Sequence, residues 1–236
     1  MTAIYDDVAV EYYDQTLHPT CFDFGQASSA LAADALTRVQ PRGSLVETGA
    51  GKSYFLRTPD ALPDDATLLL TDASEKMLDH SRRIAGPNVT CAIALSDDLP
   101  CADASVDFVL SLLADPYNTP SFWAEVARVL KPGARAFYTT PSYVWATSFR
   151  SEGEGEVHDS AMFLTTEGKQ VYVPSYVIDP EDQATMIARA GLTVEQVTHF
   201  TLANRLGSGE QVSRKLSGPL GEDAPVVTGF LVVKPA

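Results

Sequence analysis

The order of apolar and polar residues along the chain predicts short buried strands that alternate with helices. Five runs of apolar and β-branched residues have the length of buried strands, at 44–48, 66–71, 89–95, 106–113 and 135–140. Helical spacing of apolar residues occurs before and between these runs, at 27–39, 74–84 and 121–130. This alternation predicts an α/β fold in which a parallel sheet has helices on both faces.

After residue 140 the pattern changes. Two apolar runs, 161–166 and 170–174, flank Glu167-Gly168-Lys169 and predict a β-hairpin. Helical spacing returns at 180–190, and two further strands are predicted at 192–200 and 226–233. We therefore expect a single domain over residues 1–236, with residues 141–178 inserted as a cap over its cleft.

The first strand, 44–48, ends in a tight turn that contains Gly49 and Gly51. Glycine is required where φ must be positive, or where a ligand lies against the main chain. A helix that begins after such a turn offers free N–H groups and the positive end of its dipole. Asp72 and Asp115 follow other strands, so one cleft at the carboxyl ends of the strands can collect all these residues. The pattern predicts a site for a small polar ligand.

Composition and charge limit the partners. The chain has 236 residues and a net charge of −14, which argues against binding to nucleic acid or anionic membranes. No apolar run approaches the ~20 residues of a membrane span, and no secretory signal is visible. Three cysteines without C-x-x-C spacing argue against disulfides and a zinc site, and favour a reducing compartment. We expect a cytoplasmic protein without a metal.

Four motifs in order resemble those of class I S-adenosylmethionine-dependent methyltransferases. They are ETGAGKS (47–53), LTDASEKML (70–78), DDLPCADASVD (97–107) and EVARVLKPG (125–133). The first motif alone is a weak signal, but all four at ordinary spacings are specific. The resemblance covers about residues 5–191 and implies a Rossmann-like sheet of seven strands, mostly parallel with the last strand antiparallel, that carries the β-hairpin cap.

The resemblance implies S-adenosylmethionine as the cofactor and a set of residues that bind it. That set is Tyr12, Glu47, Gly49, Ala50, Gly51, Asp72, Ala73, Met77, Ser96 and Asp97. Residues 3–14 have partial helical spacing, and in relatives such an N-terminal segment closes over the cofactor. We therefore expect residues 1–40 to form a helical lid.

The family's roles suit these residue types. The glycines let the main chain approach the amino-acid end of the cofactor, and Glu47 can attract its ammonium group. Asp72 can accept hydrogen bonds from both ribose hydroxyls, as in dinucleotide-binding folds; a helix N-cap is the other interpretation. Ala73 and Met77 can flank the adenine, although for Met77 plain core packing is an equal alternative.

Three features depart from the family pattern. Ser53 stands where a third glycine is common, and the helix after the first motif is short because Pro59 limits it. In many relatives an acidic residue contacts the adenine amino group at the position of Leu95. Here Asp97 can take over that contact, or the Ser96 main chain with apolar packing from Leu95 can suffice.

Methyl transfer needs the acceptor held in line with the methyl group, and an O–H or N–H acceptor also needs a general base. Asp115 follows the fourth predicted strand, at the mouth of the cleft. Tyr143 begins an aromatic-rich stretch, and His158 lies in the predicted cap. We predict these three as the catalytic residues, with an ordinary surface position as the alternative for His158.

Aromatic residues gather in the predicted cap: Tyr143, Trp145, Phe149, Tyr172 and Tyr176. They can line an acceptor pocket for an aromatic or hydrophobic small molecule. Equally, they can form a small core of the cap itself.

The sequence favours an enzyme that methylates an oxygen or nitrogen nucleophile of a small-molecule metabolite. A protein methyltransferase is one alternative, although it needs an open groove and the hairpin predicts a closed pocket. The other is a catalytically silent protein that binds S-adenosylmethionine or S-adenosylhomocysteine as a sensor or partner subunit. A homodimer remains open.

Overall fold

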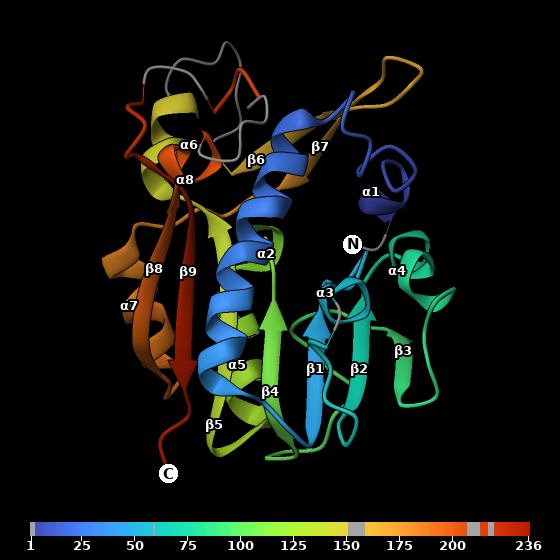
Figure 1. The fold of residues 1–236 in the computed structure, drawn as a ribbon, viewed down its shortest axis with the longest axis vertical. Coiled ribbons are helices and arrows are strands. Elements are labelled where there is room, and N and C mark those ends of the chain that lie inside the picture. The colour runs from blue at the N-terminus through green and yellow to red at the C-terminus, as the bar shows by residue number, and fades with distance from the viewer. Residues whose placement is uncertain (1–2, 59, 151–158, 207–212, 217–219) are drawn as a thin grey trace.

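A computed structural model describes residues 3–58, 60–150, 159–206, 213–216 and 220–236 (Figure 1). Its centre is a seven-stranded sheet of order β3-β2-β1-β4-β5-β9-β8. The strands are β1 Ser44–Thr48, β2 Thr67–Asp72, β3 Val89–Ile93, β4 Val106–Ser111, β5 Leu130–Pro141, β8 Thr193–Thr201 and β9 Pro225–Val233. Strands β1 to β5 are mutually parallel, and β9 is antiparallel to both β5 and β8. The α/β sheet with its antiparallel last strand is confirmed.

The strand order creates a crevice beside β1. From β1 the chain moves outward through β2 to β3, and then crosses to the other side of β1 to form β4 and β5. The connection after β1 therefore runs to one side of the sheet and the connection after β3 runs to the other side. In open α/β sheets, ligands bind in the crevice that forms between two such connections, at the carboxyl ends of the strands. The carboxyl ends of β1, β2 and β4 all lie at this edge (Figure 1).

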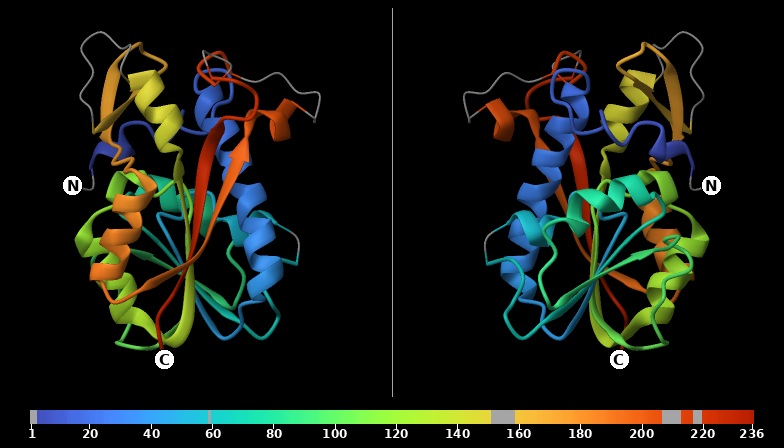
Figure 2. Two further views of the ribbon diagram at one scale, coloured as in Figure 1. Left: turned by 90° about the vertical axis from the view of Figure 1, so that its left-hand side faces the viewer. Right: turned by 90° about the vertical axis from the view of Figure 1, so that its right-hand side faces the viewer.

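Helices cover both faces of the sheet, as Figure 2 shows. Helices α2, α3 and α6 pack with Leu45, Phe108 and Phe137 on one face. Helices α5 and α7 pack with Val46, Val109 and Tyr138 on the other. The described helices are α1 Ala3–Asp6, α2 Pro19–Val39, α3 Tyr54–Arg57, α4 Glu75–Arg82, the 3-10 turn η1 Asp115–Tyr117, α5 Pro120–Val129, α6 Tyr143–Arg150, α7 Pro180–Arg189 and α8 Leu202–Leu206.

Helices α4 and α7 each begin with a side-chain N-cap. The Ser74 hydroxyl accepts a hydrogen bond from the Met77 amide (3.1 Å) at the start of α4. The Asp179 carboxylate accepts from the Glu181 amide (2.9 Å) at the start of α7. Each side chain satisfies an N–H group that has no partner inside its helix.

Several boundaries differ from the sequence expectation. Helix α2 begins at Pro19 rather than at residue 27, because proline fits the first turn of a helix. Only Ala3–Asp6 of the expected 3–14 segment is helical, and turns follow. The aromatic stretch after β5 forms helix α6, which begins where the Ser142 hydroxyl accepts from the Trp145 amide (3.0 Å).

The predicted β-hairpin is present as a separate two-stranded sheet of β6 Ser160–Leu164 and β7 Gln170–Pro174. It lies above the carboxyl ends of the strands (Figure 1). Val8 of the N-terminal segment is fully buried against it, together with Phe163, Val171 and Val173. The N-terminal segment and the hairpin, which are far apart in the sequence, therefore share a small apolar core. This core lies near the carboxyl ends of the strands. Within the described ranges, no helix is both long and apolar enough to cross a membrane.

Candidate active site

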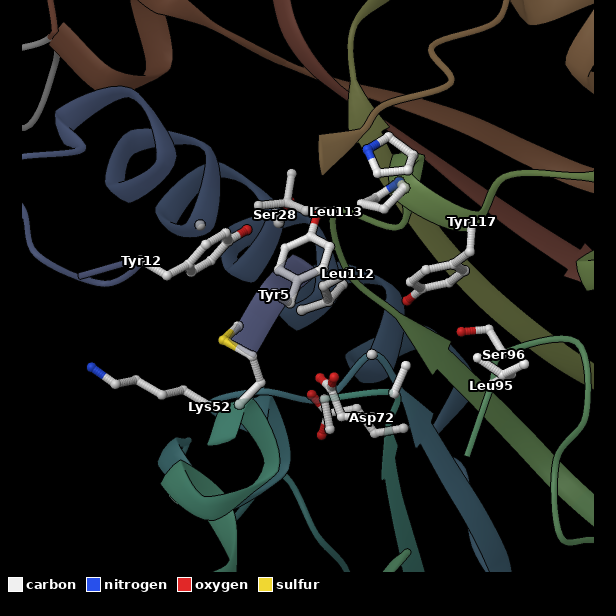
Figure 3. Close-up of a pocket in the computed structure, with 18 of the residues that line it drawn as sticks. Tyr5, Tyr12, Ser28, Lys52, Asp72, Leu95, Ser96, Leu112, Leu113 and Tyr117 are labelled. Carbon is white, nitrogen blue, oxygen red and sulfur yellow. The ribbon is translucent and has the colours of Figure 1, made fainter. Parts of the chain in front are cut away.

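A cavity of about 370 Å³ lies at the carboxyl ends of β1, β2 and β4 (Figure 3). Nine of the ten predicted cofactor residues line it: Tyr12, Glu47, Gly49, Ala50, Asp72, Ala73, Met77, Ser96 and Asp97. Gly51 is next to this wall but does not form part of it. The strand order thus brings together residues that are separated by up to 85 positions in the sequence, from 12 to 97.

The glycine turn after β1 is closely packed by two tyrosines. Gly49 and Gly51 have φ values of +63° and +42°, which favour glycine. A Cβ at Gly49 would overlap the Tyr117 hydroxyl, and a Cβ at Gly51 would overlap the Tyr13 hydroxyl. The sequence interpretation assigned this space to the cofactor alone. In the structure, the glycines also make room for the tyrosines that form the cavity walls.

Asp72 is buried at the end of β2. Its carboxylate accepts hydrogen bonds from the amides of Gly51 (3.0 Å) and Ser74 (2.9 Å). The pKa of Asp72 is raised to about 6, because the effect of burial exceeds that of the two N–H groups, which lower the pKa. The Gly51 amide therefore joins the first motif to the second, and Asp72 stands at the floor of the cavity (Figure 3).

Glu47 is buried at the end of β1 and faces the start of the short helix α3. Its carboxylate accepts from the Ser53 hydroxyl (2.5 Å) and from the Tyr54 amide (2.7 Å). Burial raises the pKa of Glu47 to about 7. The Ser53 hydroxyl also caps α3 by accepting from the Leu56 amide (3.3 Å). This double contact explains why serine replaces the third glycine of the family motif.

The wall from Leu95 to Asp97 closes the cavity beyond β4. Ser96 accepts a hydrogen bond from the Thr48 hydroxyl (3.1 Å), which holds it at the end of β1. Asp97 is exposed and accepts from the Ser121 hydroxyl (3.0 Å). All three wall residues line the cavity. Either contact proposed for the adenine, through Asp97 or through Ser96 and Leu95, remains a prediction.

The N-terminal segment supplies three tyrosines to the cavity. The Tyr13 hydroxyl accepts from the Lys52 amide (2.8 Å), and the Lys52 ammonium lies 4.3 Å from the centre of the Tyr13 ring. The rings of Tyr5 and Tyr12 lie above Asp72 (Figure 3). Burial raises the pKa of Tyr5 and Tyr12 well above the ordinary value, so both phenols are neutral. Tyr5 was not predicted as a wall residue, because the four residues of α1 are too few to show by their spacing which side faces the cavity.

Tyr117, in the loop that follows β4, is another residue of the cavity wall. Its hydroxyl donates to the Thr48 carbonyl (2.9 Å) and forms a hydrogen bond with the Ser111 hydroxyl (2.9 Å). These bonds tie η1 to the ends of β1 and β4. The available signal was its position two residues after Asp115, in the loop that follows a buried strand.

A second cavity of about 150 Å³ adjoins the first and shares with it Tyr5, Tyr12, Leu113 and Pro116. Asp115 is buried in its wall, and the Ser175 hydroxyl donates to Asp115 Oδ2 (2.5 Å). The Tyr176 amide donates to the Asp115 carbonyl (2.8 Å). The segment after β7 thus holds Asp115 in place beside the boundary between the two cavities.

The other two predicted catalytic residues are not brought to either cavity. Tyr143 is 37% exposed at the start of α6 and lines neither of them, because the helix turns this side chain outward. His158 lies outside the described residues. Of the other aromatic cap residues, Trp145 and Phe149 line the second cavity and Tyr176 the first, whereas Tyr172 is exposed.

In the part of the chain that the structure describes, no three histidine, cysteine, aspartate or glutamate side chains are grouped to hold a metal ion. The three cysteines are free.

Comparison with known families gives a match over residues 45–133 to the methyltransferase domain. These residues are a methyltransferase domain. The match spans the strands and turns that build the first cavity, from Leu45 to Gly133. It confirms the family that the four motifs indicate, and with it the transferase class and S-adenosylmethionine as the cofactor.

One relative of the methyltransferase domain is the biotin biosynthesis bifunctional protein BioHC of Cellvibrio japonicus. The two are 32% identical over 117 residues, which are 49% of this chain and 23% of that protein. The match therefore spans less than a quarter of the length of this relative.

Solved structures share the fold of most of the chain. An S-adenosylmethionine-dependent methyltransferase from Mesorhizobium loti superposes with a TM-score of 0.64 at 18% identity, over 89% of this chain and 99% of that one. Geranyl diphosphate C-methyltransferase from Streptomyces coelicolor, solved with Mg2+, geranyl diphosphate and S-adenosyl-L-homocysteine, gives a TM-score of 0.63 at 12% identity, over 87% and 79% of the two chains.

Proposed function

We propose that the protein transfers a methyl group from S-adenosylmethionine to an oxygen or nitrogen nucleophile of a small-molecule metabolite. The observation that carries this proposal is the pair of adjacent cavities. The larger contains the predicted cofactor residues, and the smaller contains Asp115 next to the shared wall. A donor and an acceptor held in these two cavities meet at Leu113 and Pro116.

The first cavity fits the cofactor by charge and by shape. S-adenosylmethionine carries an ammonium and a sulfonium, and the walls contain the carboxylates of Glu47, Asp72 and Asp97. Apolar side chains of Met77 and Leu112 stand beside these acids, as an uncharged ring system requires. When bound, the cofactor supplies a methyl group on a sulfonium that becomes a neutral thioether as the acceptor's lone pair takes the methyl.

The protein's own residues then perform two tasks. Glu47 and the glycine turn hold the amino-acid end of the cofactor, and Asp72 orients the ribose. Asp115 accepts the proton that an O–H or N–H acceptor loses, while Ser175 keeps the carboxylate in position through its hydrogen bond to Oδ2. Tyr143 lines neither cavity and takes no part in this mechanism.

Two segments enclose the reactants in this proposal. Residues 1–40 act as the lid, since Tyr5, Tyr12 and Tyr13 cover the first cavity. Residues 141–178 act as the cap, since Trp145 and Phe163 cover the second. Enclosure by both segments supports a small acceptor rather than a protein chain, which requires an open groove.

Screening of cell extracts tests the proposal. Extracts depleted of protein are incubated with the enzyme and a donor labelled with deuterium in its methyl group, and labelled products are identified by mass. We expect a labelled small molecule that forms with the wild type and not with Asp115→Asn. Label that appears only when proteins are restored would support a protein substrate instead. Donor binding with no labelled product in either extract would support a silent sensor.

A further inference from the structure

A lysine stands at the wall of the second cavity in a protein with a net charge of −14. Lys215 is exposed, and its ammonium lies 5.1 Å from the centre of the Phe149 ring. Lys215 forms no ion pair with any residue that the structure describes. The ammonium group is therefore available to an anion that enters the cavity.

The turn that carries Lys215 is anchored on both sides. The Trp145 indole N–H donates to the Lys215 carbonyl (3.1 Å). The Ser213 amide donates to the Asp23 carboxylate (2.8 Å), and Leu216 is buried in the core. These contacts fix the main chain at 213–216 against α2 and α6, and with it the point from which the Lys215 side chain reaches the cavity wall.

The wall beside Lys215 is aromatic. The Trp145 and Phe149 rings stack with centres 5.2 Å apart and planes at 7°. Phe24 meets Trp145 edge-on, with centres 4.8 Å apart and planes at 88°. All three rings line the cavity. Aromatic side chains in a cavity wall favour contact with another aromatic ring, edge-on or offset-stacked.

The cavity also has opposite charges at two places. The pKa of the Cys21 thiol is raised to about 12, chiefly by burial; Asp115 also raises this pKa and Lys215 lowers it, so the two charges act in opposite directions. Asp115 and Lys215 both line only the second cavity, and Asp115 stands in the chain between Leu113 and Pro116 of the wall shared with the first cavity. The Asp115 carboxylate therefore adjoins the donor cavity, whereas no residue of 213–216 belongs to the lining of that cavity.

We propose that the second cavity binds an aromatic carboxylic acid, with its carboxylate on Lys215, its ring against Trp145 and Phe149, and its nucleophile toward Asp115. This inference rests on the proposed function and adds a substrate class to it. In an acidic protein, an anionic acceptor is repelled by the surface as a whole. Lys215 supplies the local attraction that overcomes this repulsion.

The test compares acids with their uncharged amides. Dissociation constants of 4-hydroxybenzoate, 4-hydroxyphenylacetate and 4-hydroxycinnamate, and of the three corresponding primary amides, are measured by ligand-observed NMR with and without S-adenosylhomocysteine. We expect at least one acid to bind about tenfold more tightly than its amide, the effect of a charge-assisted hydrogen bond. Lys215→Met should abolish this preference and Lys215→Arg should retain it.

Arg189→Met is the matched control, because it removes one exposed positive charge from the end of α7, away from both cavities. It should leave the acid preference intact. Binding of none of the three acids, or a preference that survives Lys215→Met, would overturn the inference. The acid preference is measured without turnover, so it does not depend on catalysis. A lack of S-adenosylhomocysteine binding or of methylated product would instead contradict the proposed function.

Discussion

The ring of Tyr12 stacks on the ring of Phe163, with centres 5.3 Å apart and planes at 24°. Tyr12 belongs to the N-terminal segment and Phe163 to strand β6 of the hairpin. Tyr12 lines both cavities, and Phe163 lines the second. The two segments proposed as lid and cap therefore support each other at the boundary of the two cavities.

We predict that Phe163→Ala loosens this boundary. Loss of the stacked ring and of its apolar packing should lower the free energy of unfolding by roughly 2–4 kcal/mol. The affinity for S-adenosylhomocysteine should fall as well, because Tyr12 loses its support. Urea unfolding and calorimetry measure the two effects. Met162→Ala is the control, since this neighbour is 39% exposed and should change the affinity little. Equal affinities of both variants would show that the stack does not hold the wall.

A double-mutant cycle tests the packing of the glycine turn. Gly51→Ala should be destabilising because its Cβ overlaps the Tyr13 hydroxyl, and because the residue has positive φ. In the background of Tyr13→Phe the same substitution should cost less, since the nearest remaining ring atom, Cζ, lies 3.4 Å from that Cβ. The cost attributable to φ, about 1 kcal/mol, should remain. Strict additivity of the two substitutions in urea unfolding would refute the close contact.

The raised pKa of Glu47 predicts a specific dependence of stability on pH. A carboxyl group whose pKa is higher in the folded state, here about 7 against an ordinary 4.5, binds more protons folded than unfolded between these values. The free energy of unfolding should therefore fall as the pH rises from about 4.5 to about 7. For Glu47 the fall is on the order of 1–3 kcal/mol.

Glu47→Gln isolates this contribution, because glutamine does not titrate. Asp72, with a pKa raised to about 6, acts in the same direction and remains in both proteins. We expect the Gln variant to lose less stability than the wild type between pH 5 and pH 8, measured by urea unfolding. Identical losses of stability in the two proteins would show that Glu47 does not cause this pH dependence.

Asp115→Asn should separate catalysis from cofactor binding. The amide keeps the shape of the side chain but accepts no proton, so turnover of an identified acceptor should fall by about 10²–10⁴-fold. The affinity for S-adenosylhomocysteine should be nearly unchanged, because Asp115 lines only the second cavity. Tyr143→Phe is the control and should retain turnover, since Tyr143 lines neither cavity. Full turnover by Asp115→Asn would show that Asp115 is not the general base.

The sequence was most informative where local patterns determine the structure. Buried strands, the N-caps Ser74 and Asp179, and the β-hairpin all follow from residue spacing over a few positions. The donor side of the site was also predictable, because glycines and acids at strand ends mark it. The cavity walls that depend on long-range contacts were not predictable from the sequence. The Tyr117 hydroxyl meets the carbonyl of Thr48, 69 positions earlier, and no local spacing encodes that contact.

The acceptor side was the least predictable part. Lys215 lies far along the chain from the motifs, and only the folding of 213–216 against Trp145 brings it to the cavity. Tyr143 belongs to the same aromatic stretch as Trp145 and Phe149, but the turn of α6 directs it to solvent. A cluster of aromatic residues in sequence therefore did not reveal which of its members share a cavity.

Calorimetric titration with S-adenosylhomocysteine tests the central claim most directly. Asp72 is the buried acid at the floor of the first cavity, and Asp64→Asn is the matched control because it removes an exposed charge remote from this site. We predict that the wild type and Asp64→Asn bind alike. Asp72→Asn should lose about 1–3 kcal/mol of binding free energy, the cost of unmade polar contacts. No binding to the wild type, or equal binding to all three proteins, would contradict the account.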